Sequence, residues 1–555
     1  MKTESANDHG VSRRATLLFA GLLLAIEASY FASEGGILRA AAAWCWLACA
    51  VATLGTALAA SLAPFSRREF WSSRDVGAYL AAYLAPIALL AYGITGYAHT
   101  QINDEAVQQV AAGLGLLESR RDLGLFSTGF VGYPARQYLL AALPSLLLGK
   151  SLVALRAGFG GLFLVAYLSF LSSLRGYLEA RKAAFPLLLA GVGGALAVLG
   201  SYSILYARLF EQTTVPFAAL SLFLAGVLRM RTRPGGLGGA WAIWALGFMP
   251  YAYTPALAGW AFAMGLLAYL AATVGRESRP VFAAGLLYGA AAMAVSSLAQ
   301  ANANLASSRF VVGSVTDLGN DSWTYRLSAG LHAALGLEES LLPALLVLGI
   351  LVGLGQALRK RDWRLPSVCL WALGTMALAL LMRGYWRRVP EFDLQRAMVV
   401  LPPLSLALVL GFAAHGKPGQ DSALARGALW STILFMVLNA ASLVAIRRAP
   451  RDYVPFDVTD KEEATMLVVN AASSAAKTVY VVPPLFTHLE DTLRYFSPST
   501  RVVHGLPPAG EHVPGNFVIT YAGSELFVAE DSYALYTEHP VRFSRPRPYL
   551  RIEPE

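Results

Sequence analysis

The sequence predicts a polytopic α-helical membrane protein of about 13 transmembrane helices, followed by a small extracytoplasmic α/β domain. Three observations predict this fold class. Hydrophobic residues make up 56% of the 555 residues, charged residues make up 14%, and the mean hydropathy is +0.51. Apolar runs of about 20 residues, long enough to cross a ~30 Å hydrocarbon layer, recur up to position 446. Beyond that position charge and proline increase, and no such run remains.

The first region, residues 1–75, contains two apolar runs, at roughly 15–33 and 40–63, which we expect to form a pair of helices. Two arginines, Arg13 and Arg14, precede the first run, and two more, Arg67 and Arg68, follow the second. Because short basic loops remain in the cytoplasm, we expect the N-terminus to be cytoplasmic. Glu27 lies inside the first run, where a carboxylate is costly, so we expect it to be paired or to snorkel toward water.

The middle region, residues 76–446, contains the remaining predicted spans and three long polar loops, at 99–151, 299–339 and 383–396. Alternation of the spans from a cytoplasmic N-terminus places all three loops on the outer face. The apolar stretch at 138–148 is too short to cross the membrane, and we expect it to form a helix lying on the outer surface.

The last region, residues 447–555, has a different pattern. The runs TVYVVPP and FVITY are typical of strands, and HLEDTLRYF between them is typical of a helix. Because the final predicted span leads outward, we expect this region to be a small α/β domain outside the cytoplasm.

The net charge of +9 does not indicate a nucleic-acid partner. Many basic residues lie in short loops between spans, as membrane topology requires, so we expect no nucleic-acid binding. The three cysteines, Cys45, Cys49 and Cys369, fall inside predicted spans and form no disulfide framework. The sequence shows no zinc-ligand spacing, P-loop or dinucleotide fingerprint, so no metal site is predicted from spacing.

The adjacent carboxylates Asp104 and Glu105 open the first outer loop, in the stretch INDEAVQQV. Two carboxylates beside a bilayer can act as a general base or hold a hard divalent cation through oxygen ligands. The same residues also suit the first turn of a helix, where the helix dipole favours acidic side chains. The local pattern leaves both interpretations open.

The third outer loop carries four arginines on the side where topology disfavours cations: Arg383, Arg387, Arg388 and Arg396. Guanidinium groups match phosphate oxygens two at a time, so this loop is a candidate site for a phosphate head group at the outer leaflet. Internal pairing with Glu391 and Asp393 is the alternative interpretation.

Four further charged residues fall near the predicted outer face. Arg136, at the start of the short surface helix, is a second candidate for phosphate contact. Glu211 follows YARLF at the outer end of a span, and Arg208, one helical turn earlier, can pair with it. Arg156, just inside the next span, is expected to be a structural polar anchor.

The order of these motifs resembles the GT-C class of membrane glycosyltransferases, most closely the family of protein O-mannosyltransferases and the lipid A aminoarabinose transferase. The outer loop INDEAVQQVAAGLGLLES carries an Asp-Glu pair and precedes a YP-x-x-x-Y helix, YPARQYLLAALPSLLLG. An arginine then opens the next span in ALRAGFGGLFLVAYL, and YARLFE and QRAMVVLPPLSLAL follow in the same order. The resemblance covers roughly Val76 to the C-terminus.

The resemblance implies an enzyme that takes a sugar from a polyprenyl phosphate and transfers it, with inversion, to an extracytoplasmic lipid, glycan or protein. It makes Asp104 the catalytic carboxylate, with Glu105 and Glu211 as supporting acids. The family's phosphate-binding Lys-Pro is here Tyr133-Pro134, and Arg136 would substitute for the lysine. The expected phosphate ligands are Arg136, Arg208, Arg383, Arg387, Arg388 and Arg396. The expected location is a bacterial inner (cytoplasmic) membrane.

Two functions of other classes compete with this interpretation. A non-catalytic transporter of lipid-linked glycans would also need outer arginines, but it would need polar residues along several spans, where charges are scarce. An envelope assembly subunit would use the C-terminal domain to bind a partner. In that case Asp104 and the arginines of the third outer loop would be dispensable.

Overall fold

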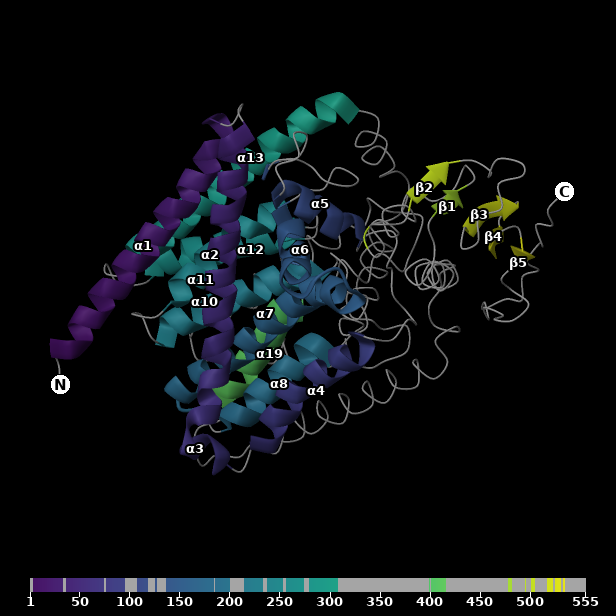
Figure 1. The fold of residues 1–555 in the computed structure, drawn as a ribbon. Coiled ribbons are helices and arrows are strands. Elements are labelled where there is room, and N and C mark those ends of the chain that lie inside the picture. The colour runs from purple at the N-terminus through teal and green to yellow at the C-terminus, as the bar shows by residue number, and fades with distance from the viewer. Residues whose placement is uncertain are drawn as a thin grey trace, which may run out of the picture.

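The structure of the 555-residue chain is a computed structural model. It describes residues 3–32, 36–73, 76–94, 107–117, 125–126, 136–183, 185–199, 214–232, 237–252, 256–273, 279–307, 399, 401–415, 478–481, 495, 501–504, 517–522, 525–530 and 533–534. These residues form a bundle of helices and a separate small sheet (Figure 1). The helices are α1 Thr3–Ala32, α2 Gly36–Leu62, η1 Ala63–Ser66, α3 Arg68–Trp71, α4 Val76–Ile94, α5 Val107–Leu117, α6 Arg136–Leu148, α7 Leu152–Ala180, α8 Pro186–Leu199, α10 Val215–Thr232, α11 Gly238–Phe248, η5 Met249–Tyr251, α12 Ala256–Thr273, α13 Arg279–Ser307 and α19 Leu401–His415.

Six of the described helices are long and apolar enough to cross a membrane, as expected of an integral membrane protein. These segments are Arg13–Ala32, Ala40–Ser66, Val153–Ala180, Val215–Thr232, Ala256–Thr273 and Arg279–Ala301. The apolar stretch at 237–251, expected to be one of the spans, forms α11 and η5, which together run from Gly238 to Tyr251. Much of the region expected to hold further spans, including residues 308–398 and 416–446, lies outside the described residues, so the count of about 13 stays a prediction.

The helix α10 forms the centre of the bundle, since every residue from Val215 to Leu228 is buried. A helix that is apolar on all sides is stable only when other helices surround it. Here α7 and α11 pack against it. A Cβ atom on Gly226 would lie 2.5 Å from the Gly238 carbonyl oxygen, so the absence of a side chain lets the two backbones touch.

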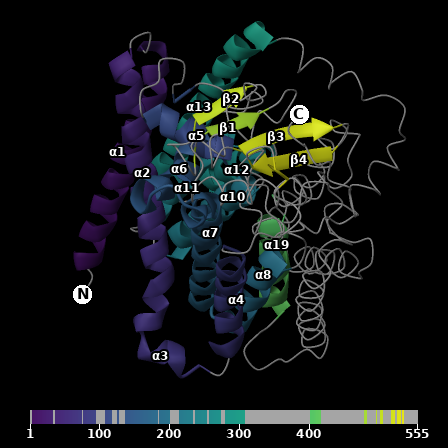
Figure 2. The same ribbon diagram turned by 45° about the vertical axis from the view of Figure 1, so that its right-hand side comes forward.

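The basic residues that flank the spans gather at one end of the bundle. A Cβ atom on Gly239 would lie 2.8 Å from Thr16 and 3.2 Å from Val281, which places the starts of α11 and α13 beside Thr16 of α1. In Figures 1 and 2, α3 lies at one end of the bundle and α5 and α6 lie toward the other. This clustering is the arrangement that the positive-inside rule requires of a single membrane face.

The C-terminal part contains a five-stranded sheet in the order β2-β1-β3-β4-β5. Its strands are β1 Thr478–Val481, β2 Arg501–His504, β3 Phe517–Ala522, β4 Glu525–Glu530 and β5 Tyr533–Ala534. The strand β1 pairs in parallel with β2 and β3, and β3, β4 and β5 pair antiparallel. The two predicted strands coincide with β1 and β3, and both are confirmed. The domain boundary at residue 447 lies outside the described residues and stays a prediction.

Candidate functional site

Three helices of the first predicted outer loop and the span after it, α5, α6 and α7, pack through glycines. A Cβ atom on Gly113 of α5 would lie 2.1 Å from the Tyr138 carbonyl oxygen of α6. A Cβ atom on Gly158 of α7 would lie 2.6 Å from the Ala141 backbone, also in α6. Interfaces between membrane helices favour small residues because they allow such close approach. The helix α6 is therefore held between α5 and α7.

The turn between α6 and α7 fixes the angle of this packing. Gly149 follows α6 with φ of +77°, a left-handed conformation that glycine adopts without strain. Ser151 then caps α7, because its Oγ accepts a hydrogen bond of 3.2 Å from the Ala154 backbone N–H. Only three residues therefore separate the end of α6 from the start of α7.

The side chain of Arg136, at the start of α6, is buried and bound to Glu27 of α1. Its Nη1 donates to Glu27 Oε1 at 2.5 Å, and its Nη2 donates to Oε2 at 3.3 Å. Arg136 is 0% exposed and Glu27 is 2% exposed. Arginine and carboxylate match in this two-nitrogen arrangement, which offsets part of the cost of removing both charges from water. The expectation that Glu27 is paired is confirmed.

Aromatic side chains enclose this ion pair. The Tyr251 hydroxyl donates to Glu27 Oε2 at 2.6 Å, and the Arg136 guanidinium carbon lies 3.4 Å from the centre of the Tyr251 ring. The rings of Phe126 and Trp46 lie 5.0 Å and 5.7 Å from the same carbon, within the range of cation–π attraction. The Tyr288 hydroxyl is buried as well and has no hydrogen-bond partner among the described residues. Its ring occupies the space that a Cβ atom on Gly247 would fill, 1.8 Å from a ring carbon.

The structure changes two expectations about α6. A short helix is confirmed, but its first half does not lie on a surface, because all residues from Arg136 to Ala142 are buried. Only the end of the helix, at Leu146, Leu147 and Leu148, is exposed. Arg136 was predicted to contact a phosphate, and binding phosphate would now require breaking its bond to Glu27.

Most of the other predicted site residues lie outside the described residues. They are Asp104, Glu105, Arg208, Glu211, Arg383, Arg387, Arg388 and Arg396. The described element that follows the acid pair in the sequence is α5, which begins at Val107, three residues after Asp104. Because α5 packs on α6, the chain that leaves the acid pair leads directly to the helix that carries Arg136.

Arg156 is 2% exposed within α7, one turn after the Ser151 cap, which agrees with an expected polar anchor. Sequence reasoning missed Tyr251, Tyr288 and Phe126, which surround the ion pair. One signal could have pointed to them: a carboxylate inside an apolar span needs buried hydrogen-bond donors, and tyrosine supplies one. Which tyrosines those are depends on the packing of α1 against α11 and α13.

The C-terminal part contacts this region through one described residue. The Tyr495 hydroxyl shares a hydrogen bond of 2.6 Å with Ser145 Oγ of α6 and donates a longer one, of 3.5 Å, to the Ser151 carbonyl oxygen. Burial raises the pKa of the Tyr495 hydroxyl above its ordinary value of 10.0, and the bonds to Ser145 and Ser151 offset part of this shift. Among the described residues, no group of three or more His, Cys, Asp or Glu side chains could hold a metal ion.

Comparisons with known proteins give a distant structural likeness. No family model matches the chain, and no curated protein matches it. Two solved structures are similar in shape, both of ArnT from Cupriavidus metallidurans, one in the apo state and one bound to undecaprenyl phosphate. Each is 14% identical, with 77% of this chain and 85% of that chain covered, and the TM-scores are 0.42 and 0.41.

Proposed function

We propose that the protein is a membrane glycosyltransferase of the GT-C class. It would move a sugar from a polyprenyl-phosphate donor to an extracytoplasmic lipid, glycan or protein, with inversion at the anomeric carbon. The proposal starts from the order of motifs in the sequence. Its structural support is the clamp formed by α5, α6 and α7, which ties the segment following Asp104 and Glu105 to a rigid part of the bundle.

The packing of Gly113 against Tyr138 is the single observation that carries most weight. A catalytic carboxylate on a loop must be held within a fraction of an ångström of the productive position, and loops gain such precision from the elements next to them. Here α5 begins at Val107 and touches the α6 backbone at Tyr138. The buried bond between Arg136 and Glu27 then fixes α6 to α1.

In the proposed mechanism, Asp104 accepts the proton of an acceptor hydroxyl or amine as that group attacks the anomeric carbon. A positioned general base typically contributes about 10²–10⁴-fold to the rate. Glu105 and Glu211 are the acids that support Asp104 in this step. The bond from the sugar to the phosphate oxygen breaks on the opposite face, so the configuration inverts.

Cations would stabilise the charge that develops on the departing phosphate. In the proposal this is the role of Arg208 and the arginines of the third outer loop, and electrostatic stabilisation of this kind is often the largest catalytic contribution. Arg136 would not contact the phosphate in this mechanism; its role would be to position α6. Its guanidinium holds the start of α6 to α1, and this orients the helix that follows the acid pair.

The proposal is tested by measuring sugar transfer by the purified full-length protein. Radiolabelled polyprenyl-phosphate sugars would be supplied with lipid, peptide and glycan acceptors, and product would be counted for wild type and for Asp104→Asn. We expect the variant to fold and to lose transfer. Glu69→Gln, an exposed acid in α3, is the matched control and should retain activity. Near-normal transfer by Asp104→Asn would reject the catalytic assignment.

A further inference from the structure

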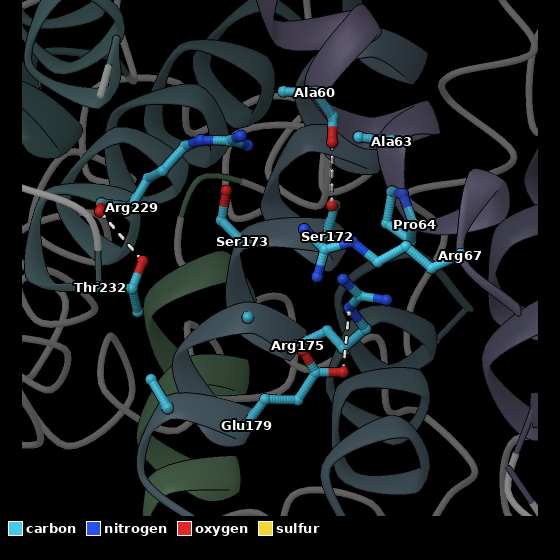
Figure 3. A pocket seen from close by; sticks show the side chains of 12 residues that line it. Ala60, Ala63, Pro64, Arg67, Ser172, Ser173, Arg175, Glu179, Arg229 and Thr232 are labelled. Atoms are coloured by element: carbon cyan, nitrogen blue, oxygen red, sulfur yellow. Dashed lines mark hydrogen bonds and ion pairs between the residues drawn. The ribbon is translucent and has the colours of Figure 1, made fainter. Parts of the chain in front are cut away.

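A cavity of about 290 Å³ opens beside the turn that precedes α3 (Figure 3), and neither Glu27 nor Arg136 lines it. Its walls come from the end of α2, the turn before α3 and the last turns of α7 and α10. Ala60 in this wall lies about 36 Å along α2 from Gly36, given the rise of ~1.5 Å per helical residue. Arg136, the one predicted site residue that the structure describes with its contacts, does not line this space.

Three arginines from three elements line the cavity. Arg67 comes from the turn before α3, Arg175 from α7 and Arg229 from α10. In Figure 3 the guanidinium groups of Arg67 and Arg175 lie near each other beside and below Ser172. The Arg229 side chain extends above Ser173 from the opposite wall, and its guanidinium carbon lies 5.0 Å from the centre of the Trp241 ring. Arginines that line one concave site raise the electrostatic potential inside it and favour an anion.

One carboxylate accompanies these cations. Glu179 Oε1 lies 3.5 Å from Arg175 Nε, and the Glu179 side chain is 41% exposed. An exposed pair at this separation on one helix is weak. Among the described lining residues, Arg67 and Arg175 by themselves already outnumber this carboxylate.

Two features distinguish this cavity from the ordinary basic flank of a membrane helix, whose side chains extend into water. Arg175 is only 7% exposed, and its guanidinium carbon lies 5.7 Å from the Phe70 ring and 5.9 Å from the Tyr79 ring, which hold it in place. Ser173 is 5% exposed, and its Oγ has no hydrogen-bond partner among the described residues. A buried hydroxyl beside fixed guanidinium groups is a donor suited to a phosphate oxygen.

The residues around the cavity indicate that it lies at the level of the lipid head groups. Trp71 of α3 is 53% exposed, and exposed tryptophan is enriched at the membrane–water interface. Leu62, next to the lining residue Ala63, is 49% exposed and offers an apolar surface beside the cavity mouth. A phosphate at this level can enter while acyl chains stay against the helices.

We propose that this cavity is an anion site that binds the phosphate group of an anionic membrane lipid. Arg67, Arg175 and Arg229 hold the phosphate oxygens, and Ser173 donates a further hydrogen bond. The cavity lies at the basic ends of α7 and α10, and Arg136 is not among its lining residues. Its existence does not depend on glycosyl transfer.

The test measures thermal unfolding of the full-length protein in a mild neutral detergent. Short-chain phosphatidic acid, short-chain phosphatidylcholine and inorganic phosphate would be titrated separately. We expect phosphatidic acid to raise the melting temperature with saturation and phosphatidylcholine to leave it unchanged. Saturable stabilisation by phosphatidic acid without stabilisation by inorganic phosphate identifies the lipid source. If inorganic phosphate stabilises as well as phosphatidic acid, the lipid assignment is rejected; no response to either rejects the site.

Three variants test whether the response comes from the cavity. Arg67→Gln should weaken binding about tenfold, the loss expected for one charged hydrogen bond. Glu179→Gln removes the competing carboxylate and should tighten binding severalfold, an effect that damage to the fold would not produce. Arg231→Gln, in α10 but outside the lining, is the matched control. Equal losses for Arg67→Gln and Arg231→Gln, or weaker binding by Glu179→Gln, would overturn the proposal.

Discussion

The guanidinium of Arg136 donates to both carboxylate oxygens of Glu27, which lies 109 residues earlier in the chain. This contact gives the first helix a specific partner in the body of the protein. The family resemblance begins near Val76 and leaves α1 and α2 without a role. In the structure α1 supplies the counter-charge for the start of α6, so the N-terminal helix is part of the framework of the candidate site.

Replacing one partner of this pair should destabilise the protein strongly. Arg136→Met and Glu27→Gln should each lower the free energy of unfolding by about 3–5 kcal/mol, because each leaves a buried polar or charged group without its partner. The double variant should recover much of that loss. The measurement is a double-mutant cycle by denaturant unfolding in mild detergent.

Glu179→Gln is the control for that cycle, because it removes an exposed carboxylate at 3.5 Å from Arg175. We expect a change below about 1 kcal/mol. A similar small change for Glu27→Gln would show that the buried pair does not hold α6 to α1.

Tyr251→Phe isolates the hydroxyl that donates to Glu27 at 2.6 Å. A hydrogen bond to a charged group contributes about 1.5–3 kcal/mol, and the variant should lose that amount while its ring still covers the Arg136 guanidinium. The free energy of unfolding would be compared with that of Tyr177→Phe, which removes the hydroxyl of a half-buried tyrosine in α7. Equal effects of the two variants would contradict the assigned bond.

Two glycines of α7 should respond oppositely to alanine. Gly158→Ala places a Cβ atom 2.6 Å from the Ala141 backbone and must push α6 away, which lowers stability and, under the proposed function, transfer. Gly161→Ala meets nothing within 4 Å and should leave stability unchanged or raise it by up to about 1 kcal/mol. Melting temperature and transfer rate would be measured together. Equal tolerance of both variants would show that the α6–α7 contact is not tight.

The raised pKa of Tyr495 predicts an alkaline limit for its contact with α6. A folded-state pKa above the unfolded value of 10.0 means that the stabilisation is fully present below pH 10.0 and is lost as pH rises through the folded pKa. Tyr495→Phe should remove this component of the pH dependence. Melting temperature would be followed from pH 8 upward, and an unchanged alkaline slope in the variant would contradict the contact.

Several features follow from the sequence alone because they depend on local pattern. Apolar runs of the length of a membrane span predict helices, and described spans at α1, α2, α7, α10, α12 and α13 fall where those runs lie. The unusual position of Glu27 predicted a partner without identifying it. Asp104, Glu105, Arg208, Glu211 and the arginines of the third outer loop stay predictions, since they lie outside the described residues.

The sequence by itself determined that the chain is a helical membrane protein, because hydropathy acts residue by residue along the chain. Only the tertiary structure decided that Arg136 is bound to Glu27 and that Arg67, Arg175 and Arg229 share one cavity. Both facts arise from contacts between helices that are distant in sequence. Helix periodicity fixes which face of each helix is apolar, but the close approach allowed by glycines such as Gly113, Gly158 and Gly226 decides which faces meet.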